Sequence, residues 1–324
     1  MSIGGTSQRT PPISPGLRYS YYRMLNRRQI LCGLSAAALP VQAKEPLIDT
    51  HIHLFEPDRI PYHPTATYRP PAEPLAPYLE FVKLAAINHV IVVHPEPYQD
   101  DHRYLSYCFE QESPRGLFKG TCLFDPIDPA TPKRMQEIVK RHPGRIVAIR
   151  IHAMNAPGEA PVRSGAIKNR DLRDPAMKTV WRAAAKLGLA IQLHFLPHHA
   201  PEIGALAAEF KDVPVILDHM GRFGQGRPED YDAVMQLAMS PRVYFKFSGW
   251  GYSSKQPAPH PDLNRFVVGA FDNFGAERIL WGGLAHSLAG IKAASAVFEA
   301  QFSSALAADR ARIRGGNAAK LFRF

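Results

Sequence analysis

The 324-residue sequence has only three cysteines and no internal repeat. Three cysteines are too few for a disulfide framework. Cys108 and Cys122 could form one disulfide bridge or remain two buried thiols, and both alternatives stay open. The first predicted strand is not followed by a glycine-rich turn, which argues against dinucleotide binding. No linker of distinct composition divides the chain. These absences favour one large globular domain, which a chain with 45% hydrophobic residues can support.

The positive charge is unevenly distributed along the chain. The formal net charge is +10, but residues 1–43 contain five arginines and no acidic residue. Without those arginines, 34 basic residues remain against 29 acidic ones, with no extended basic run. A mild excess of this kind suits a small anionic molecule better than a nucleic acid. We therefore predict a small-molecule substrate and no nucleic-acid partner.

The basic N-terminus is typical of a targeting segment. Asn26-Arg27-Arg28-Gln29 precedes the apolar stretch from Leu31 to Leu39, and Val41-Gln42-Ala43 resembles a signal cleavage site. This pattern predicts a twin-arginine export signal within a leader over residues 1–43, with Met24 as the start. The apolar stretch is too short for a permanent membrane anchor. The expected location is the periplasm, with the twin-arginine export machinery as a partner; a basic tail on a cytoplasmic protein is the alternative.

From residue 46 onward, short apolar or β-branched segments alternate with amphipathic helical patterns such as Pro175–Leu187 and Ala200–Phe210. This alternation is typical of βα units around a parallel sheet. Eight strands in about 280 residues predict a (β/α)8 TIM barrel over residues 44–324, with a doubly wound open sheet as the alternative. The predicted strands are Leu47–His51, His89–Val93, Leu117–Leu123, Arg145–Ile151, Ala190–His194, Val213–Leu217, Val243–Phe247 and Arg278–Trp281.

Two segments outside this repeat have their own predictions. The proline-rich stretch Pro57–Pro77 is too long for an ordinary connection, so we expect a functional loop at the barrel mouth. Ala308–Phe324 is expected to pack on the barrel as a closing helix or tail.

Four histidines fall where predicted strands end, which is the face that carries the active site in TIM barrels. His51 and His53 follow the first strand, and their spacing of two places both imidazoles on one side of an extended chain. His194 ends the fifth strand and His219 follows the sixth. Two converging imidazoles are half of a zinc site, and a third would leave one position open for water. A bound metal would lower the pKa of that water toward about 7.

The chain resembles the amidohydrolase-related family 2 of TIM-barrel hydrolases over roughly residues 46–324. The resemblance is carried by Ile48-Asp49-Thr50-His51-Ile52-His53, Leu217-Asp218-His219-Met220-Gly221-Arg222, Lys246-Phe247-Ser248-Gly249 and Arg278-Ile279-Leu280-Trp281-Gly282. Within the family, the chain is similar to the branch of 2-pyrone-4,6-dicarboxylate and 4-sulfomuconolactone hydrolases.

The resemblance implies roles for individual residues. His51, His53 and His194 would bind a divalent metal, for which zinc is expected and manganese or metal-free function are alternatives. His219 would polarise the scissile carbonyl. Arg222, and in the same way Arg150, would hold a substrate carboxylate through a planar guanidinium. Tyr98 lies in a segment similar to the family's second loop and would donate a hydrogen bond to the substrate.

One residue departs from the family motif. Where the family has a catalytic aspartate after Trp-Gly, this chain has Leu284, which cannot accept a proton. Loss of a general base costs a factor of about 10² to 10⁴ in rate. Three explanations remain open: the protein binds without catalysis, another base such as His286, Glu96 or Asp125 serves, or three histidines suffice to ionise a metal-bound water. Asp218 is not counted among the predicted catalytic residues, because it is as suited to orienting its neighbours.

These observations predict a metal-dependent hydrolase that opens a lactone or a similar carbonyl compound bearing a carboxylate. Its predicted catalytic residues are His219 and His286. The alternatives are a lapsed enzyme that binds an anionic metabolite, and a metal-dependent decarboxylase on the same barrel.

Overall fold

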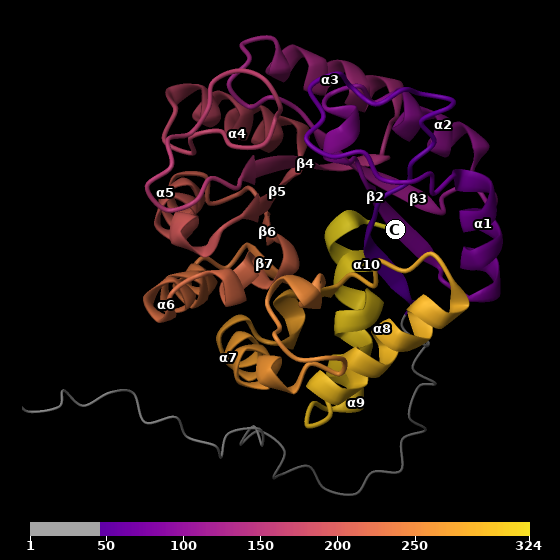
Figure 1. Cartoon of the computed structure of the whole chain (residues 1–324), viewed down its shortest axis with the longest axis vertical. Helices are drawn as coiled ribbons and strands as arrows, with labels where there is room; N and C mark the ends of the chain where they lie inside the picture. The colour runs from indigo at the N-terminus through magenta and orange to yellow at the C-terminus, as the bar shows by residue number, and fades with distance from the viewer. Residues whose placement is uncertain (1–45) are drawn as a thin grey trace, which may run out of the picture. The chain divides into compact units, whose positions relative to one another are not determined.

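The protein folds as a (β/α)8 TIM barrel, which confirms the predicted fold class. The computed structural model describes residues 46–324, and the predicted export signal lies outside these residues. Eight parallel strands follow one another around the sheet in sequence order. Figure 1 shows the strands around the centre with the helices outside them. The open doubly wound alternative is therefore wrong, because its strand order would reverse at a switch point.

The strand positions agree with the predicted segments to within two residues. The strands are β1 (Ile48–Ile52), β2 (His89–Val93), β3 (Phe118–Leu123), β4 (Ile146–Ala153), β5 (Ala190–Phe195), β6 (Val215–Leu217), β7 (Val243–Phe247) and β8 (Ile279–Trp281). The helices of the described chain are α1 (Leu75–Leu84), α2 (Arg103–Gln111), α3 (Thr131–Arg141), α4 (Pro175–Leu187), α5 (Ala200–Glu209), α6 (Pro228–Gln236), α7 (Asn264–Phe274), α8 (Leu288–Gln301), α9 (Ala307–Ala311) and α10 (Asn317–Phe322).

Helix α4 has the predicted boundaries because its ends are marked in the sequence. The Asp174 side chain accepts a hydrogen bond from the Ala176 backbone N–H, and Pro175 occupies the first helical position. Gly188 ends the helix in a left-handed conformation with φ of 66°. Local signals thus mark both ends of the helix: a capping aspartate and a proline at its start, and a glycine after its last residue. The predicted and observed ends agree for this reason.

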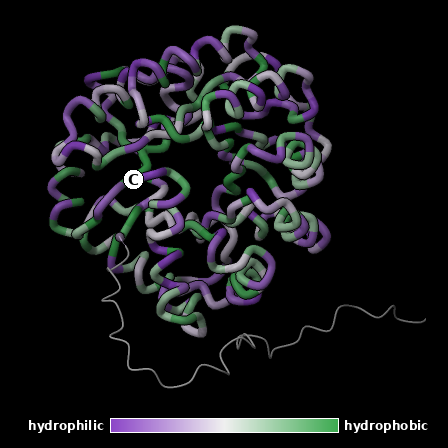
Figure 2. The backbone as a smooth tube through the Cα atoms, turned by 180° about the vertical axis from the view of Figure 1, so that it is seen from behind, coloured by the Kyte–Doolittle hydropathy of each residue, from purple (hydrophilic) through white to green (hydrophobic). Residues whose placement is uncertain are grey.

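The barrel is filled at its N-terminal end by small and branched apolar side chains. Ile48, Ile91, Ala148 and Ile216 form one buried cluster, which also contains Phe322 of α10. The C-terminal segment is therefore a closing element, as predicted: α10 contacts β1 and β8 and is drawn inside the ring of strands in Figure 1. Figure 2 shows hydrophobic stretches along the strands and hydrophilic ones around the outside. The N-terminal end of the barrel is therefore apolar, and the polar side chains described below lie at the opposite, C-terminal mouth.

Side chains close the seam between β8 and β1. The Thr50 hydroxyl donates to the Trp281 carbonyl oxygen at 2.7 Å, and the Gly283 N–H donates to Asp49 Oδ1 at 2.9 Å. Lys246 on β7 donates to the Thr50 carbonyl oxygen at 3.1 Å. Bonds from two strands thus hold β1 in place at the point where the first histidine motif begins.

The proline-rich segment after β1 is fixed to the next loop along the barrel. The His63 N–H donates to the Pro97 carbonyl oxygen at 2.8 Å, and the Thr67 N–H donates to the Glu96 carboxylate at 3.2 Å. Both acceptors lie in the short helix η1 (Glu96–Tyr98), directly beyond β2. The loop therefore lies on the C-terminal side of the barrel, where the predicted site is.

The two cysteines of the described chain are buried free thiols. Cys108 lies in α2 and Cys122 in β3, and they form no disulfide with each other. Of the two alternatives that the sequence left open, the structure has the buried thiols. None of the helices in residues 46–324 has the length and apolar character needed to cross a membrane.

The closing segment generates a first prediction. A Cβ at Gly315 would clash with the Pro46 carbonyl oxygen, immediately before β1. We expect Gly315→Ala to lower the free energy of unfolding by about 1–3 kcal/mol, because overpacking forces the backbone to shift. Gly251→Ala is the matched control, since a Cβ there has no atom within 4 Å. Urea unfolding midpoints measure both, and equal midpoints would contradict the proposed contact.

Candidate functional site

The four predicted histidines meet at the mouth of the barrel. The ring of His51 lies 4.9 Å from that of His53 and 4.5 Å from that of His219, measured between centroids. The ring of His194, from β5, lies 5.2 Å from that of His219. The strands thus bring together side chains that are up to 168 positions apart in sequence, between residues 51 and 219. They form one polar cluster, as the sequence predicts.

His51 and His53 present two nitrogens to one point. Their Nε2 atoms are 3.2 Å apart, and His53 Nδ1 lies 2.7 Å from the Val93 carbonyl oxygen. Because a carbonyl only accepts, Nδ1 carries the proton of neutral His53, and its Nε2 has a free lone pair. A hydrogen bond from the ring nitrogen that does not bind the metal commonly orients a metal-binding histidine. The pair therefore has a geometry that suits metal binding.

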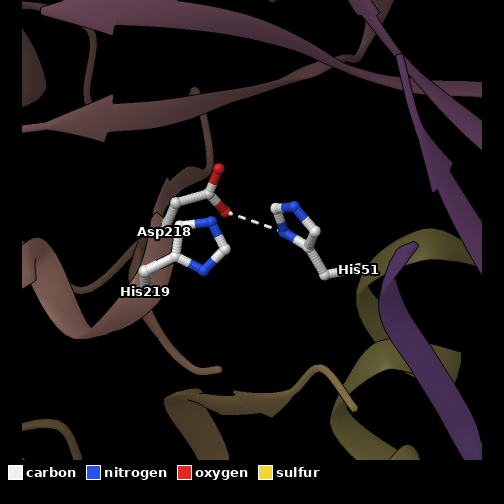
Figure 3. Close-up of side chains that lie close together, drawn as sticks. All are labelled: His51, Asp218 and His219. Atoms are coloured by element: carbon white, nitrogen blue, oxygen red, sulfur yellow. Dashed lines mark ion pairs between the residues drawn. The ribbon is translucent and has the colours of Figure 1, made fainter. Parts of the chain in front are cut away.

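Asp218 is the most heavily bonded side chain of the site. Arg150 donates to its Oδ2 through Nε at 3.0 Å and pairs with it through Nη2 at 2.9 Å. Gln192 donates to both carboxylate oxygens at 2.9 Å, and Lys246 Nζ lies 3.1 Å from Oδ1. His51 Nδ1 approaches Oδ1 at 3.5 Å, the pair that Figure 3 marks with a dashed line. All five side chains are buried, so one carboxylate holds strands β4, β5 and β7 together beneath the histidines.

The electrostatics of this cluster keep the carboxylate charged and the imidazoles neutral. Burial raises the pKa of Asp218, but Lys246 and Arg150 outweigh it and hold that pKa well below its ordinary value. Burial lowers the pKa of His51 well below its ordinary value and, together with Arg150, lowers that of His53 to about 3. Burial also lowers the pKa values of His194 and His219. Neutral imidazoles retain the lone pairs that metals or protons need.

His219 is positioned by an unusual backbone turn. Four successive residues from His219 to Arg222 have φ between 49° and 61°, the left-handed region that costs most L-residues about 1–2 kcal/mol each. The Ser248 hydroxyl lies 3.0 Å from His219 Nδ1, which leaves Nε2 for another partner. A Cβ at Gly249 would come within 2.5 Å of the same Nδ1, so glycine is required there. Backbone strain of this kind concentrates at functional sites.

Two overlapping sets of residues could hold a metal ion. His51, Asp218 and His219 each offer a ligand atom, and these atoms lie within 4.8 Å of one another. Separately, zinc bound tetrahedrally at 2.0–2.1 Å places nitrogens about 3.3–3.4 Å apart, close to the 3.2 Å between His51 and His53. His51 Nδ1 is buried, and its contact with Asp218 Oδ1 at 3.5 Å is too long for a normal hydrogen bond. The donor set therefore fits a divalent metal, although both Asp218 oxygens already accept several bonds.

His194 makes a different contact from the one that metal binding would require. Arg222 Nε donates to His194 Nε2 at 2.9 Å, so that nitrogen is occupied in this structure. The guanidinium of Arg222 also lies 3.9 Å from the centroid of the Tyr252 ring. The predicted metal role of His194 stays a prediction, and the predicted carboxylate-binding residue lies beside the histidine cluster.

The other predicted residues lie around the cluster with partners of their own. Arg150 is committed to Asp218 and only 3% exposed, and its predicted role at a substrate carboxylate stays a prediction. The Tyr98 hydroxyl accepts a hydrogen bond from the Glu56 N–H at 2.7 Å. His286 Nε2 lies 3.0 Å from Glu73, and burial lowers the His286 pKa to about 4, which makes it a weak base near neutral pH.

The alternative bases Glu96 and Asp125 are also bonded. The Glu96 carboxylate accepts hydrogen bonds from the Thr67 N–H and the Gln99 side chain. Asp125 accepts hydrogen bonds from Arg170 Nε at 3.0 Å and Nη2 at 2.8 Å. Both carboxylates thus stabilise loops around the mouth.

Leu284 occupies a backbone conformation that suits the family's aspartate. Its φ is 51°, in the left-handed region that aspartate and asparagine tolerate better than leucine does. The preceding Gly283 N–H donates to Asp49 Oδ1, which also accepts from the His51 N–H at 3.0 Å. Burial raises the pKa of Asp49 to about 7. The backbone at position 284 could therefore accommodate an aspartate more easily than the leucine that is present.

The sequence prediction omitted the polar layer beneath the histidines. Asp218, Lys246 and Gln192 are almost fully buried and belong to one bonded network. A signal was available, because charged residues within strands of a barrel cannot stay buried without a partner. Arg150 and Lys246 in β4 and β7 therefore required a carboxylate, and Asp218 directly follows β6, one of the two strands between them in the ring.

The closed barrel, the histidines at its mouth and the buried carboxylate define a TIM-barrel protein of the amidohydrolase class. A family model described as Amidohydrolase matches residues 48–324, and the chain belongs to that family.

Known proteins resemble this chain in sequence and in structure. An L-fucono-1,5-lactonase of Burkholderia ambifaria is 32% identical over an alignment 164 residues long, and this alignment covers 46% of this chain and 55% of the lactonase. The chain thus matches about half the length of that relative. A structure described as a probable 2-pyrone-4,6-dicarboxylic acid hydrolase from Acinetobacter baumannii, with citric acid bound, has a TM-score of 0.67 at 19% identity. That match covers 86% of this chain and 99% of the hydrolase.

A further structure similar to this chain contains a metal. An amidohydrolase of Burkholderia multivorans with bound zinc has a TM-score of 0.64 at 19% identity, with 86% of this chain and 99% of that chain covered. At this identity, the structural matches show the fold that the proteins share.

The buried carboxylate generates a second prediction. We expect Asp218→Asn to lower the free energy of unfolding by about 3–5 kcal/mol, because Arg150 and Lys246 would be left buried without their anion. Asp171→Asn is the matched control, since it removes a carboxylate whose partner Arg173 is at the surface. Urea unfolding measures both variants. A small effect of Asp218→Asn, equal to the control, would contradict the assigned role.

Proposed function

We propose that the protein hydrolyses a lactone or a similar small carbonyl compound that bears a carboxylate. The observation that carries this proposal is a cation without an anion beside neutral imidazoles. Arg222 is only 9% exposed and has no carboxylate partner among the described residues, while its guanidinium adjoins the histidine cluster. Membership of the amidohydrolase family and the resemblance to an L-fucono-1,5-lactonase support a hydrolytic reaction.

The residues of the site have distinct roles in this proposal. Arg222 binds the substrate carboxylate with a planar guanidinium that suits two parallel hydrogen bonds. His219, with Nδ1 next to the Ser248 hydroxyl, can donate from Nε2 to the carbonyl oxygen as negative charge develops there. His51 and His53 would hold a divalent metal, for which zinc is our first choice. When bound, the metal supplies a water of lowered pKa and a Lewis acid.

The proton of the attacking water has no dedicated acceptor at position 284. Leucine cannot take it, and the neighbouring Asp49 is tied to the seam between β8 and β1, where its Oδ1 accepts two backbone N–H groups. We therefore expect slow hydrolysis by the natural chain. The same observation favours a second candidate function, in which the protein binds an anionic metabolite without converting it.

Restoring the carboxylate distinguishes the two functions and gives a third prediction. We expect Leu284→Asp to raise kcat by about 10² to 10⁴ on a panel of carboxylate-bearing lactones, because a general base contributes that factor. Leu284→Asn is the matched control, as it adopts the same backbone conformation without a proton acceptor. Turnover by the natural chain supports the hydrolase, and activity that appears only in Leu284→Asp supports the binding protein. Inactivity of all three chains would contradict the proposed hydrolysis.

Metal binding gives a fourth prediction. We expect His51→Asn and His53→Asn each to lower the affinity for zinc at least about 100-fold, because each removes one of two converging nitrogens. His63→Asn is the control, since its Nδ1 contacts Thr65 in an exposed part of the loop after β1. Zinc titration with a competing chelator measures the affinities. If the two variants retain the affinity of the control, the assigned ligands are wrong.

A further inference from the structure

Three buried arginines surround the barrel mouth, and they differ in how their charge is compensated. Arg150 pairs with Asp218, and Arg170 pairs with Asp125 at 2.8 Å. Arg222 forms no ion pair with any residue of the described chain, although its side chain is also mostly buried. A buried guanidinium without an anion is unfavourable unless other groups hold it. The contacts that hold Arg222 therefore indicate which kind of ligand it could bind.

Uncharged side chains support Arg222 on several sides. Its Nε donates to His194 Nε2 at 2.9 Å, and its Nη1 donates to Gln225 Oε1 at 3.2 Å. The face of the guanidinium covers the Tyr252 ring at 3.9 Å, a cation–π distance. With Nε and one N–H of Nη1 taken, the second N–H of Nη1 and the N–H groups of Nη2 remain for a ligand. That end has the geometry for a carboxylate bound through two parallel hydrogen bonds.

The contact also determines what His194 can do. Guanidinium N–H groups only donate, so His194 Nε2 must be the acceptor and the ring proton must lie on Nδ1. That Nδ1 is buried without a partner in the described chain. The tautomer in which Nε2 accepts a hydrogen bond from Arg222, and does not bind a metal, therefore leaves the Nδ1–H group unpaired at a cost in free energy. The tight left-handed turn from His219 to Arg222 fixes the backbone from which the arginine reaches β5.

We propose that His194 is a positioning residue that, together with Tyr252, holds Arg222 as the receptor for a substrate carboxylate. This inference rests on the proposed function, since it assumes that Arg222 takes the carboxylate. It leaves metal binding to His51 and His53 and gives the fifth-strand histidine a role in substrate recognition.

Two amide substitutions separate the two nitrogens of the ring. Glutamine in His194→Gln places an acceptor about where Nε2 lies, whereas the shorter side chain in His194→Asn places it about where Nδ1 lies. Calorimetric titration of the full chain with glutarate measures carboxylate binding, and dimethyl glutarate is the uncharged control. We expect His194→Asn to weaken glutarate binding about tenfold and His194→Gln to stay within about threefold of the natural chain. Zinc content by elemental analysis should be the same in both variants.

Each other result overturns the inference. If His194→Gln weakens binding as much as His194→Asn, an acceptor at the Nε2 position is not what matters. If both variants bind glutarate normally and lose zinc, His194 is a metal ligand instead.

Arg222→Met distinguishes the inference from the proposed function. Loss of glutarate binding in Arg222→Met, with normal binding in His194→Asn, overturns the inference alone. Normal binding in Arg222→Met, or no binding by the natural chain, overturns the assigned carboxylate receptor and the inference with it.

Discussion

The site depends on one buried carboxylate that holds two cations. Asp218 accepts bonds from Arg150 and Lys246, which come from strands on either side of it, and from Gln192. Separating charges in such a place leaves an unpaired ion in a medium of low polarity, which costs several kcal/mol. The histidines above this layer can therefore keep fixed positions. Two cations on one carboxylate also leave a local excess of positive charge, which attracts anionic ligands to the mouth.

The local excess of positive charge around Asp218 affects the protonation of the histidines. The imidazoles stay neutral because burial and neighbouring cations both oppose their protonation. In the proposed function, recognition of an anion is left to Arg222, which is held by aromatic and imidazole groups instead of by a carboxylate. A cation prepared in this way loses little when it binds an anion, because no internal ion pair has to be broken.

The sequence predicted the fold well because its signals are local or periodic. The alternation of strands and helices identified all eight strands, and Asp174, Pro175 and Gly188 fixed the ends of α4. It could not predict the left-handed turn after β6, where only Gly221 carries a local signal. The bond between Arg222 and His194 was equally inaccessible. It depends on the side-chain conformation of one residue and the strand position of another, which sequence spacing does not encode.

The seam between the first and last strands has an evolutionary consequence. Asp49 and Thr50 belong to the same short motif as His51, and their side chains join β1 to the end of β8. Selection for a closed barrel would preserve these residues in a descendant that had stopped turning over its substrate. The presence of Asp49 and Thr50 before the first histidine is therefore explained by the requirement that the barrel folds, and it does not indicate catalysis. The residue after Gly283, which the seam does not constrain through its side chain, is a better indicator of whether catalysis has been kept.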